Sequence, residues 1–305
     1  MPHNSSGTCS RQRNLTPYKK RIWRGINPLL PLHYDQEALM DIEELRSRPH
    51  LSASGINDYV ECGLLYKLSR IDGFNKEFIP EALIFGSAVH EALREFYKER
   101  MNGMTLSCEE LIMRFENTWR DKAEGNDNIS YKDGKDYTTL LNEGKSLLDI
   151  YYQNLRDDHF RVLAVEEPFE FTLEGLDTPV IGIIDLMEED ESGTLIITDH
   201  KTAGKSSTSD DVDRNFQLTV YHMAARYNGY ADREILLKLD CLIKTKTPRF
   251  EAYYTTRSEK DERRAIRKIL AVAHGITKGI FIPNDTSWKC KDCTYKTHCN
   301  DWFGG

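Results

Sequence analysis

Long apolar stretches are absent from this sequence of 305 residues. No run approaches the roughly 18 consecutive apolar residues that a membrane-spanning helix needs, so we expect no membrane partner. The N-terminus also lacks the apolar core of a secretory signal peptide, and we therefore expect a cytoplasmic protein. An excess of positive charge is missing as well, because the formal net charge is −8, which argues against a passive nucleic-acid coat protein.

Acidic residues are missing from residues 1–34, and the basic residues of this segment are Arg11, Arg13, Lys19, Lys20, Arg21 and Arg24. Such a segment could act as an electrostatic arm for a phosphate backbone, and the alternative is a solvated tail. Prolines recur through residues 1–50, so we predict a basic, partly irregular N-terminal arm there. A globular pattern begins at Leu51, and the hydrophobic content of 39% is enough for a real core.

The hydrophobic periodicity predicts helices first, then strands, then a helix, two strands and a final helix. The expected helices cover about 55–69, 85–100, 107–123, 136–156, 213–227 and 259–278. The expected strands cover 160–165, 169–173, 180–187, 194–201, 235–244 and 250–255. This order predicts an α/β fold with a mixed central β-sheet flanked by helices. We expect one domain over 51–305, with a helical insertion at about 104–156 and a cysteine-rich tail at 288–305.

The segment 182–201 reads as two apolar strands that each deliver a carboxylate, Asp185 and Asp199. Lys201 lies on the same strand face as Asp199, because alternate residues of a strand share a face. Two carboxylates in apolar surroundings favour a bound divalent cation such as Mg²⁺, and a lysine beside them can neutralise charge on a phosphate. The segment therefore indicates metal-dependent phosphodiester hydrolysis, with an ordinary surface hairpin as the alternative.

The register of this hairpin is a separate expectation. A simple pairing sets Asp185 about three residues away from the position that faces Asp199, an offset on the order of 10 Å. A shared ion would then require strand twist, a bulge or another register. Glu166 and Glu167 precede the hairpin and could lie near the site, but we rank them below the two aspartates.

Of the seven cysteines, three lie close together in the tail as Cys290-x2-Cys293-x5-Cys299. In a reducing compartment such cysteines are not expected to form disulfides, and their spacing suits a metal centre. A fourth local cysteine is missing. Thiolates suit either a [4Fe–4S] cluster or Zn²⁺, and His298 could complete a zinc site.

Several segments together resemble the PD-(D/E)xK nuclease superfamily, most closely its RecB-like and Cas4-like exonuclease branch. They are, in chain order, Ser52–Cys62, Gly86–Leu93, Gly182–Asp185, Asp199–Thr202, Gln217–Tyr221 and the cysteine tail. Each segment alone is a weak signal, whereas the ordered set spans residues 52–299. The resemblance implies a restriction-endonuclease-like core.

The resemblance also implies roles for single residues. His90, Asp185, Asp199 and the backbone carbonyl of His200 would hold Mg²⁺ or Mn²⁺, and Lys201 would be the catalytic cation. The helix-borne pair of Gln217 and Tyr221 would support the substrate or the lysine. Cys62 would join Cys290, Cys293 and Cys299 as ligands of a structural [4Fe–4S] cluster, with Zn²⁺ as the alternative.

The expected function is that of a metal-dependent DNA nuclease, an exonuclease acting on DNA ends or single strands in recombination, repair, replication or phage- or CRISPR-related processing. The alternative is a non-catalytic iron–sulfur DNA-binding subunit of a helicase–nuclease or spacer-acquisition complex. No Gly-x4-Gly-Lys-Ser/Thr loop occurs in the sequence, so a helicase partner would be a separate chain. Such a protein is expected in the cytoplasm of a bacterium or a phage-infected cell.

Overall fold

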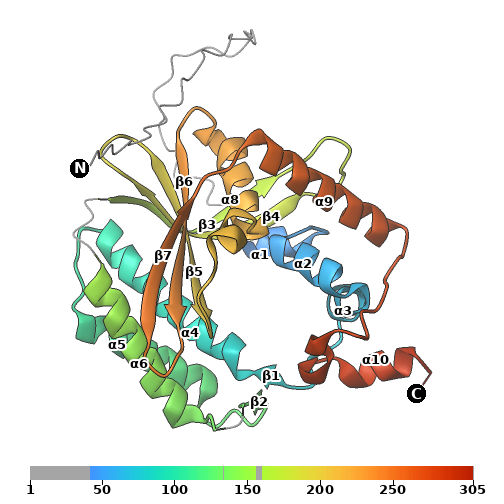
Figure 1. Ribbon diagram of the computed structural model, residues 1–305, viewed down its shortest axis with the longest axis horizontal. Helices are drawn as coiled ribbons and strands as arrows, with labels where there is room; N and C mark the ends of the chain where they lie inside the picture. The colour runs from blue at the N-terminus through green and yellow to red at the C-terminus, as the bar shows by residue number, and fades with distance from the viewer. Residues whose placement is uncertain (1–41, 133, 156–159, 305) are drawn as a thin grey trace, which may run out of the picture. The chain divides into compact units, whose positions relative to one another are not determined.

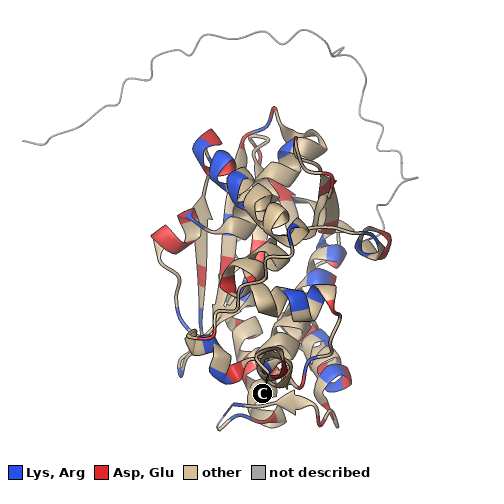
Figure 2. Ribbon diagram, turned by 90° about the vertical axis from the view of Figure 1, so that its right-hand side faces the viewer, with Lys and Arg blue, Asp and Glu red and all other residues tan. Residues whose placement is uncertain are grey.

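The computed structural model describes residues 42–132, 134–155 and 160–304. The predicted basic arm therefore lies almost entirely outside the described residues. Among the described helices, none is both long enough and apolar enough to cross a membrane. Lys and Arg residues are interspersed with Asp and Glu along these helices (Figure 2).

A five-stranded mixed sheet forms the centre of this part of the chain (Figure 1), in the order β3-β4-β5-β6-β7. The strands are β3 Arg161–Phe171, β4 Val180–Glu189, β5 Leu195–Ala203, β6 Ile235–Ile243 and β7 Arg249–Thr255. β5 and β6 run parallel, and the other neighbours are antiparallel. The predicted α/β class with a mixed sheet is confirmed. A short parallel pair, β1 Ile79–Pro80 with β2 Ile129–Ser130, was not expected from the sequence.

Helices cover both faces of the sheet (Figure 1). One face packs against α4 Glu81–Met101, α5 Cys108–Ala123 and α6 Tyr137–Asn154. The other face packs against α2 Ala53–Glu61, α8 Phe216–Ala225 and α9 Glu259–Thr277. The chain therefore has one apolar core on each side of the sheet, and residues of β5 and β6 separate the two.

Local signals explain where the long helices begin. α5 has a capping box, because the Ser107 side chain accepts from the Glu110 N–H and the Glu110 side chain accepts from the Ser107 N–H. A second capping box, formed by Ser258 and Asp261, begins α9. In α4 the predicted apolar stripe is buried, from Phe85 to Phe96.

Residues 42–51 are tied to the sheet rather than irregular. The helix α1 spans Ile42–Ser47, and its Leu45 is buried. Leu51 then adds a bridge to the start of β4, where its N–H donates to the Pro179 carbonyl and its carbonyl accepts from the Ile181 N–H, both at 2.8 Å. The prediction of irregular structure was wrong for residues 42–47, because Leu45 gives this turn an apolar side to bury.

The helix expected over 55–69 is broken at Cys62. Cys62 has extended backbone angles, and its Sγ accepts from the Leu65 N–H at 3.4 Å at the start of α3 Gly63–Tyr66. A π-helical turn, η1 Lys67–Ile71, follows. Gly63 permits a close crossing, since a Cβ there would lie 2.7 Å from the Ile282 backbone nitrogen. The sequence pattern missed the break because apolar residues continue through it.

Two further boundaries differ from the predictions. The helix expected over 213–227 begins later, as α8 at Phe216, because the Asn215 side chain caps it by accepting from the Leu218 N–H at 3.0 Å. A separate short helix, α7 Ser209–Asp213, precedes it and was not expected. A π-helical turn, η2 Arg226–Tyr230, ends α8. The two strands expected over 160–173 are one strand, β3, in which Pro168 is tolerated because β3 is an edge strand.

The C-terminal segment returns to α2 and α3 through η3 Trp288–Asp292 and α10 Lys296–Trp302 (Figure 1). The Asn284 side chain donates to the Glu61 carbonyl at 2.9 Å, and Lys289 pairs with the Glu61 carboxylate at 2.7 Å. Leu64 and Leu68 pack with Tyr295 and with cysteines from both ends of this arrangement. Segments more than 200 residues apart thus share one small apolar cluster.

Candidate active site

The pairing of strands β4 and β5 ends next to the two aspartates, Asp185 on β4 and Asp199 on β5. This pairing runs from Glu189↔Leu195 to Leu186↔Thr198, and one step further would set Asp185 opposite Asp199. Instead, the Asp185 Oδ2 accepts from the His200 N–H at 2.9 Å. The expected three-residue offset is therefore wrong. The turn at 190–194 is held by the Asp190 side chain, and this fixes the register that brings the two aspartates level.

His90 approaches this gap from α4. Its Nδ1 lies 3.4 Å from Asp185 Oδ2, and the ring also hydrogen-bonds to the backbone of His200. Burial lowers the pKa of His90, the nearby Lys201 charge lowers it further, and Asp199 opposes both effects. The lowered pKa favours the neutral imidazole, which is the form that binds metals.

Glu166 joins the same group from β3. One ligand atom each from His90, Glu166 and Asp185 lie within 4.8 Å of one another. Glu166 is the single non-glycine residue with a positive φ among the described residues, at 55°. Such a conformation costs on the order of 1–3 kcal/mol and is typically held in place at functional sites. The sequence ranked Glu166 too low, although two acids in an apolar strand were a usable signal.

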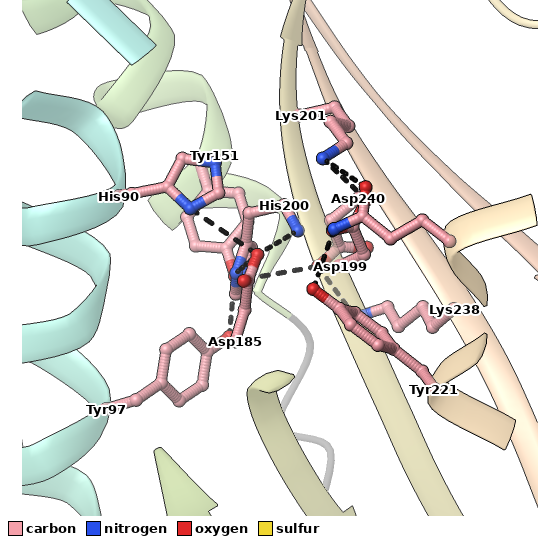
Figure 3. Close-up of polar contacts among 11 residues, drawn as sticks. His90, Tyr97, Tyr151, Asp185, Asp199, His200, Lys201, Tyr221, Lys238 and Asp240 are labelled. Carbon is pink, nitrogen blue, oxygen red and sulfur yellow. Dashed lines mark hydrogen bonds and ion pairs between the residues drawn. The ribbon is translucent and has the colours of Figure 1, made fainter. Parts of the chain in front are cut away.

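Asp199 and Lys201 occupy the sheet face turned to α8 (Figure 3). Asp199 is fully buried, and its Oδ2 lies 3.1 Å from the Lys201 Nζ. Lys201 also donates to the Gln217 Oε1 at 3.1 Å, and the Gln217 amide donates to the Tyr221 hydroxyl at 2.7 Å. Gln217 and Tyr221 thus hold the lysine side chain, whose 40% exposure leaves its ammonium accessible.

The electrostatics of the two aspartates favour a cation. Burial raises the pKa of Asp185 and of Asp199 to about 6 each. Burial alone would lower the pKa of Lys201, but the charges of Asp199 and Asp185 outweigh it and raise that pKa. Even so, the Asp199 Oδ1 has no hydrogen-bond partner in the described part of the chain. Buried carboxylate oxygens with so few hydrogen-bond partners are suitable ligands for a hard divalent ion, so the residues present suit Mg²⁺ or Mn²⁺.

The four cysteines form a second site. A cavity of about 370 Å³ is lined by Cys62, Cys290, Cys293 and Cys299. The Cys62 Sγ accepts from the Asn284 N–H at 3.4 Å, in addition to the Leu65 N–H. Burial raises the pKa of Cys293 and Cys299, and the thiols of the other members raise it further. His298 instead stacks on Phe74, with 4.1 Å between ring centroids.

The spacing of these sulfurs bears on which group they suit. Among the described residues, no three of the cysteine sulfurs lie within 4.8 Å of one another. A tetrahedral zinc site with Zn–S bonds of about 2.3 Å would hold its sulfurs roughly 3.8 Å apart. Among any three of these sulfurs, at least one pair thus lies further apart than a single zinc ion would hold it.

A basic hollow adjoins the active site. A cavity of about 260 Å³ reaches Gln217 and Tyr221, and its other polar lining residues are Arg46, His50, Ser52, Ser54 and Arg70. A larger cavity of about 940 Å³ shares four of these residues. The two cavities are therefore neighbours with positive charge between them, which suits a phosphate backbone.

The structure brings His90, Asp185, Asp199, His200, Lys201, Gln217 and Tyr221 together at one site. Sequence reasoning missed the buried polar residues around the His200 side chain, which come from α4, α6 and β6 (Figure 3). No periodic pattern could reveal them, because they meet only when three elements pack together.

The fold and this site define a class of proteins. Residues 50–300 match the PD-(D/E)XK nuclease superfamily, and the chain belongs to it. Enzymes of this superfamily usually use divalent metals.

Solved structures add a likeness of fold. A candidate exonuclease from Eubacterium rectale aligns with a TM-score of 0.53 at 12% identity, over 86% of this chain and 94% of that chain. The protein SSO0001 aligns at 14% identity over 84% of this chain and 94% of that chain, with a TM-score of 0.35 that is too low to bear on the fold. The search among curated proteins gave no match.

Proposed function

We propose that the chain is a Mg²⁺- or Mn²⁺-dependent DNA exonuclease of the RecB-like and Cas4-like branch, acting on DNA ends or single strands. The observation that carries the proposal is the meeting of His90, Glu166 and Asp185 within 4.8 Å, beside the ion pair of the buried Asp199 with Lys201. The likeness to a candidate exonuclease supports the exonuclease assignment by analogy.

Each residue has a defined part in this proposal. His90, Asp185 and Asp199, with the His200 carbonyl and Glu166, would hold the metal. A bound Mg²⁺ or Mn²⁺ would lower the pKa of a water molecule and polarise the scissile phosphate. Lys201 presents its ammonium to the charge that develops on the phosphate, and Gln217 restricts that ammonium to one position.

The basic hollow supplies a path for the strand. Arg46, His50 and Arg70 face the cavity that reaches Gln217 and Tyr221. Cations at that place would hold the phosphates that flank the scissile bond, while the hydroxyls of Ser52 and Ser54 offer hydrogen bonds to phosphate oxygens. The preference for ends or single strands is part of the proposal.

The substitution Lys201→Ala tests the catalytic assignment. We expect the variant to fold and to bind Mn²⁺, while cleavage of end-labelled DNA falls by at least about 10²-fold, because a positioned charge is lost. Lys260→Ala is the matched control, since Lys260 is exposed on α9 and should leave the rate unchanged. Wild-type cleavage by Lys201→Ala, or cleavage that persists in EDTA, would contradict the proposal. A wild-type chain without nuclease activity would favour a non-catalytic DNA-binding subunit.

We also propose that Cys62, Cys290, Cys293 and Cys299 hold a [4Fe–4S] cluster. The lining of one cavity by all four cysteines supports a shared metal centre, and the resemblance to the nuclease family favours a cluster, with Zn²⁺ as the alternative. Its role would be structural, because the ligands come from both ends of the domain proposed for residues 51–305. Protein purified without oxygen should contain about four iron and four sulfide per chain. A colourless protein with stoichiometric zinc would contradict this assignment.

The biological partner is a further part of the proposal. A helicase, recombination or CRISPR protein that works with this nuclease would be a separate chain. Co-purification of the tagged protein with a nucleotide-hydrolysing partner would support this, and purification of the active nuclease by itself would favour a stand-alone exonuclease.

A further inference from the structure

The side chain of His200 lies on the opposite sheet face from the lysine it precedes (Figure 3). It is 4% exposed and points into the core formed with α4 and α6, where Tyr97 and Tyr151 pack against it. His200 is also the register partner of Asp240 on β6. A group of polar side chains, among them His200, Lys238 and Asp240, is therefore buried beside the apolar core on this face.

The contacts of this imidazole form a continuous series. The Tyr97 and Tyr151 hydroxyls lie 2.6 Å apart, and the Tyr151 hydroxyl lies 3.3 Å from His200 Nε2. Asp240 Oδ2 is 4.0 Å from the same Nε2, and the Lys238 Nζ lies 3.0 Å from that Oδ2. On the other side of the ring, His200 Nδ1 lies 3.8 Å from the Oδ2 of Asp185, which is a close approach and not a hydrogen bond.

Burying these polar side chains costs free energy that apolar side chains at the same positions would not cost. Buried hydroxyl, imidazole and charged groups are unfavourable unless each finds a partner, and a satisfied network makes a core rigid. What the network holds rigid is the peptide of His200. That peptide donates its N–H to Asp185 at 2.9 Å and hydrogen-bonds the ring of His90.

We propose that Tyr151 is a positioning residue for the metal site. The Tyr151 hydroxyl lies 2.6 Å from the Tyr97 hydroxyl and 3.3 Å from His200 Nε2. In the arrangement that we propose, Tyr151 accepts from Tyr97 and donates to Nε2, and the neutral imidazole then carries its proton on Nδ1, toward Asp185. Lys238 favours this tautomer, because its ammonium beside Asp240 reduces the pull of that carboxylate on a proton at Nε2. The fixed ring then fixes the His200 peptide, and with it the separation of Asp185 and His90.

The tautomer can be measured in the metal-free wild-type protein by long-range ¹H–¹⁵N NMR of His200. We expect a protonated Nδ1 and an unprotonated Nε2, and the opposite pattern would overturn the proposal. This measurement needs neither metal nor activity, so it is independent of the proposed nuclease function on which the inference about the metal site rests.

The substitution Tyr151→Phe tests the positioning role. It removes one hydroxyl and keeps the ring, and we expect Mn²⁺ affinity, measured by electron paramagnetic resonance without DNA, to fall about tenfold or more. We also expect the His200 ¹⁵N signals to shift. Tyr152→Phe is the matched control, because the Tyr152 hydroxyl donates to the Leu106 carbonyl, away from His200.

The outcomes separate the two proposals. If Tyr151→Phe binds Mn²⁺ as the wild type does and its His200 signals are unchanged, the positioning role is wrong and the nuclease assignment survives. If the wild type neither binds Mn²⁺ nor cleaves DNA, the nuclease assignment fails, and the NMR pattern still decides whether Tyr151 sets the tautomer.

Discussion

At the scale of single residues, the site is a cluster of carboxylates that have few hydrogen-bond or ion-pair partners for their burial. Asp199 is completely buried, yet a single lysine pairs with it and its Oδ1 has no hydrogen-bond partner among the described residues. Asp185 accepts one backbone N–H. Under the proposed function, these groups would make the metal-free protein less stable and would be stabilised by a bound cation, since the same charges are favourable beside a metal.

The pH dependence of stability follows from Asp185. Its pKa is about 6 in the folded chain because of burial, above the ordinary 3.8, so the folded state holds a proton that the unfolded chain has released. Metal-free stability should therefore fall as pH rises from about 4 to 6. In EDTA at pH 7.5, Asp185→Asn should raise the free energy of unfolding by on the order of 1–3 kcal/mol, measured with urea.

The control for that variant lies on the same hairpin. Hydrogen bonds from Ser192 and Thr194 lower the pKa of Asp190, so Asp190→Asn should lower stability at pH 7.5 instead. The increase in the free energy of unfolding caused by Asp185→Asn should become smaller as the pH is lowered toward 4. Equal stability of Asp185→Asn and wild type at pH 7.5 would show that burial does not penalise this carboxylate.

Alternation along β5 was enough to predict that Asp199 and Lys201 share a face. It allowed Glu166 to lie near the site but could not predict its approach to His90 and Asp185, because the positive φ of Glu166 is not encoded in a residue pattern. Nor could it predict the surroundings of His200, because Tyr97, Tyr151 and Asp240 are far apart in the sequence. Local periodicity is thus informative about which residues share a face and uninformative about what faces them.

At the scale of elements, periodicity predicted the types of the helices and strands better than their boundaries. The long amphipathic helices α4, α5 and α9 were predicted because an apolar stripe is a local signal. The break at Cys62 was not predicted, because tertiary contacts with residues 281–284 determine it. α10 was missed since its seven residues contain no periodic stripe.

The crossing of α3 and the C-terminal segment depends on Gly63. A Cβ at this position would meet the Ile282 backbone nitrogen at 2.7 Å, so Gly63→Ala should push the segment away and cost about 1–3 kcal/mol of stability. Urea unfolding and limited proteolysis of residues 281–304 would measure this. Gly86→Ala is the control for stability, since its Cβ would meet Thr202 Oγ1 at an ordinary 3.5 Å. Equal protease resistance in both variants would contradict the role of the crossing.

At the scale of the whole described chain, two apolar cores lie on either side of the sheet and a third, small cluster joins the ends. The mixed α/β class was predictable because the order of elements is a global property of the sequence. The meeting of Cys62 with the C-terminal cysteines came from the resemblance to a family, since no spacing rule pairs residues more than 200 positions apart.

Replacement of Cys299 by Ser tests how the ends are held. If a cluster joins them, Cys299→Ser should lose iron and make residues 283–304 more sensitive to protease before the sheet unfolds, because the link between this segment and Cys62 is lost. Cys108→Ser is the control, as Cys108 lies on α5 outside the cysteine-lined cavity. Identical iron content and protease patterns in Cys299→Ser and wild type would contradict the prediction.

The charge along the basic hollow should govern the salt dependence of DNA binding. Arg46→Ala and Arg70→Ala should each lower the slope of log K against log salt by about 1, measured in EDTA to prevent cleavage. Arg263→Ala should not change the slope, because Arg263 lies on α9 and lines neither of the two cavities. If the slope were unchanged in both Arg46→Ala and Arg70→Ala, the DNA strand would not run along the basic hollow.

The central position of β5 determines how the protein comes apart. Between Asp199 and Ala203 its backbone keeps a full register with β6, even though β4 has already separated. Amide hydrogens of a strand covered on both faces exchange with solvent only when the whole domain opens. The strand β5 should thus be among the last parts to exchange on heating, so that the proposed site and the sheet are lost together.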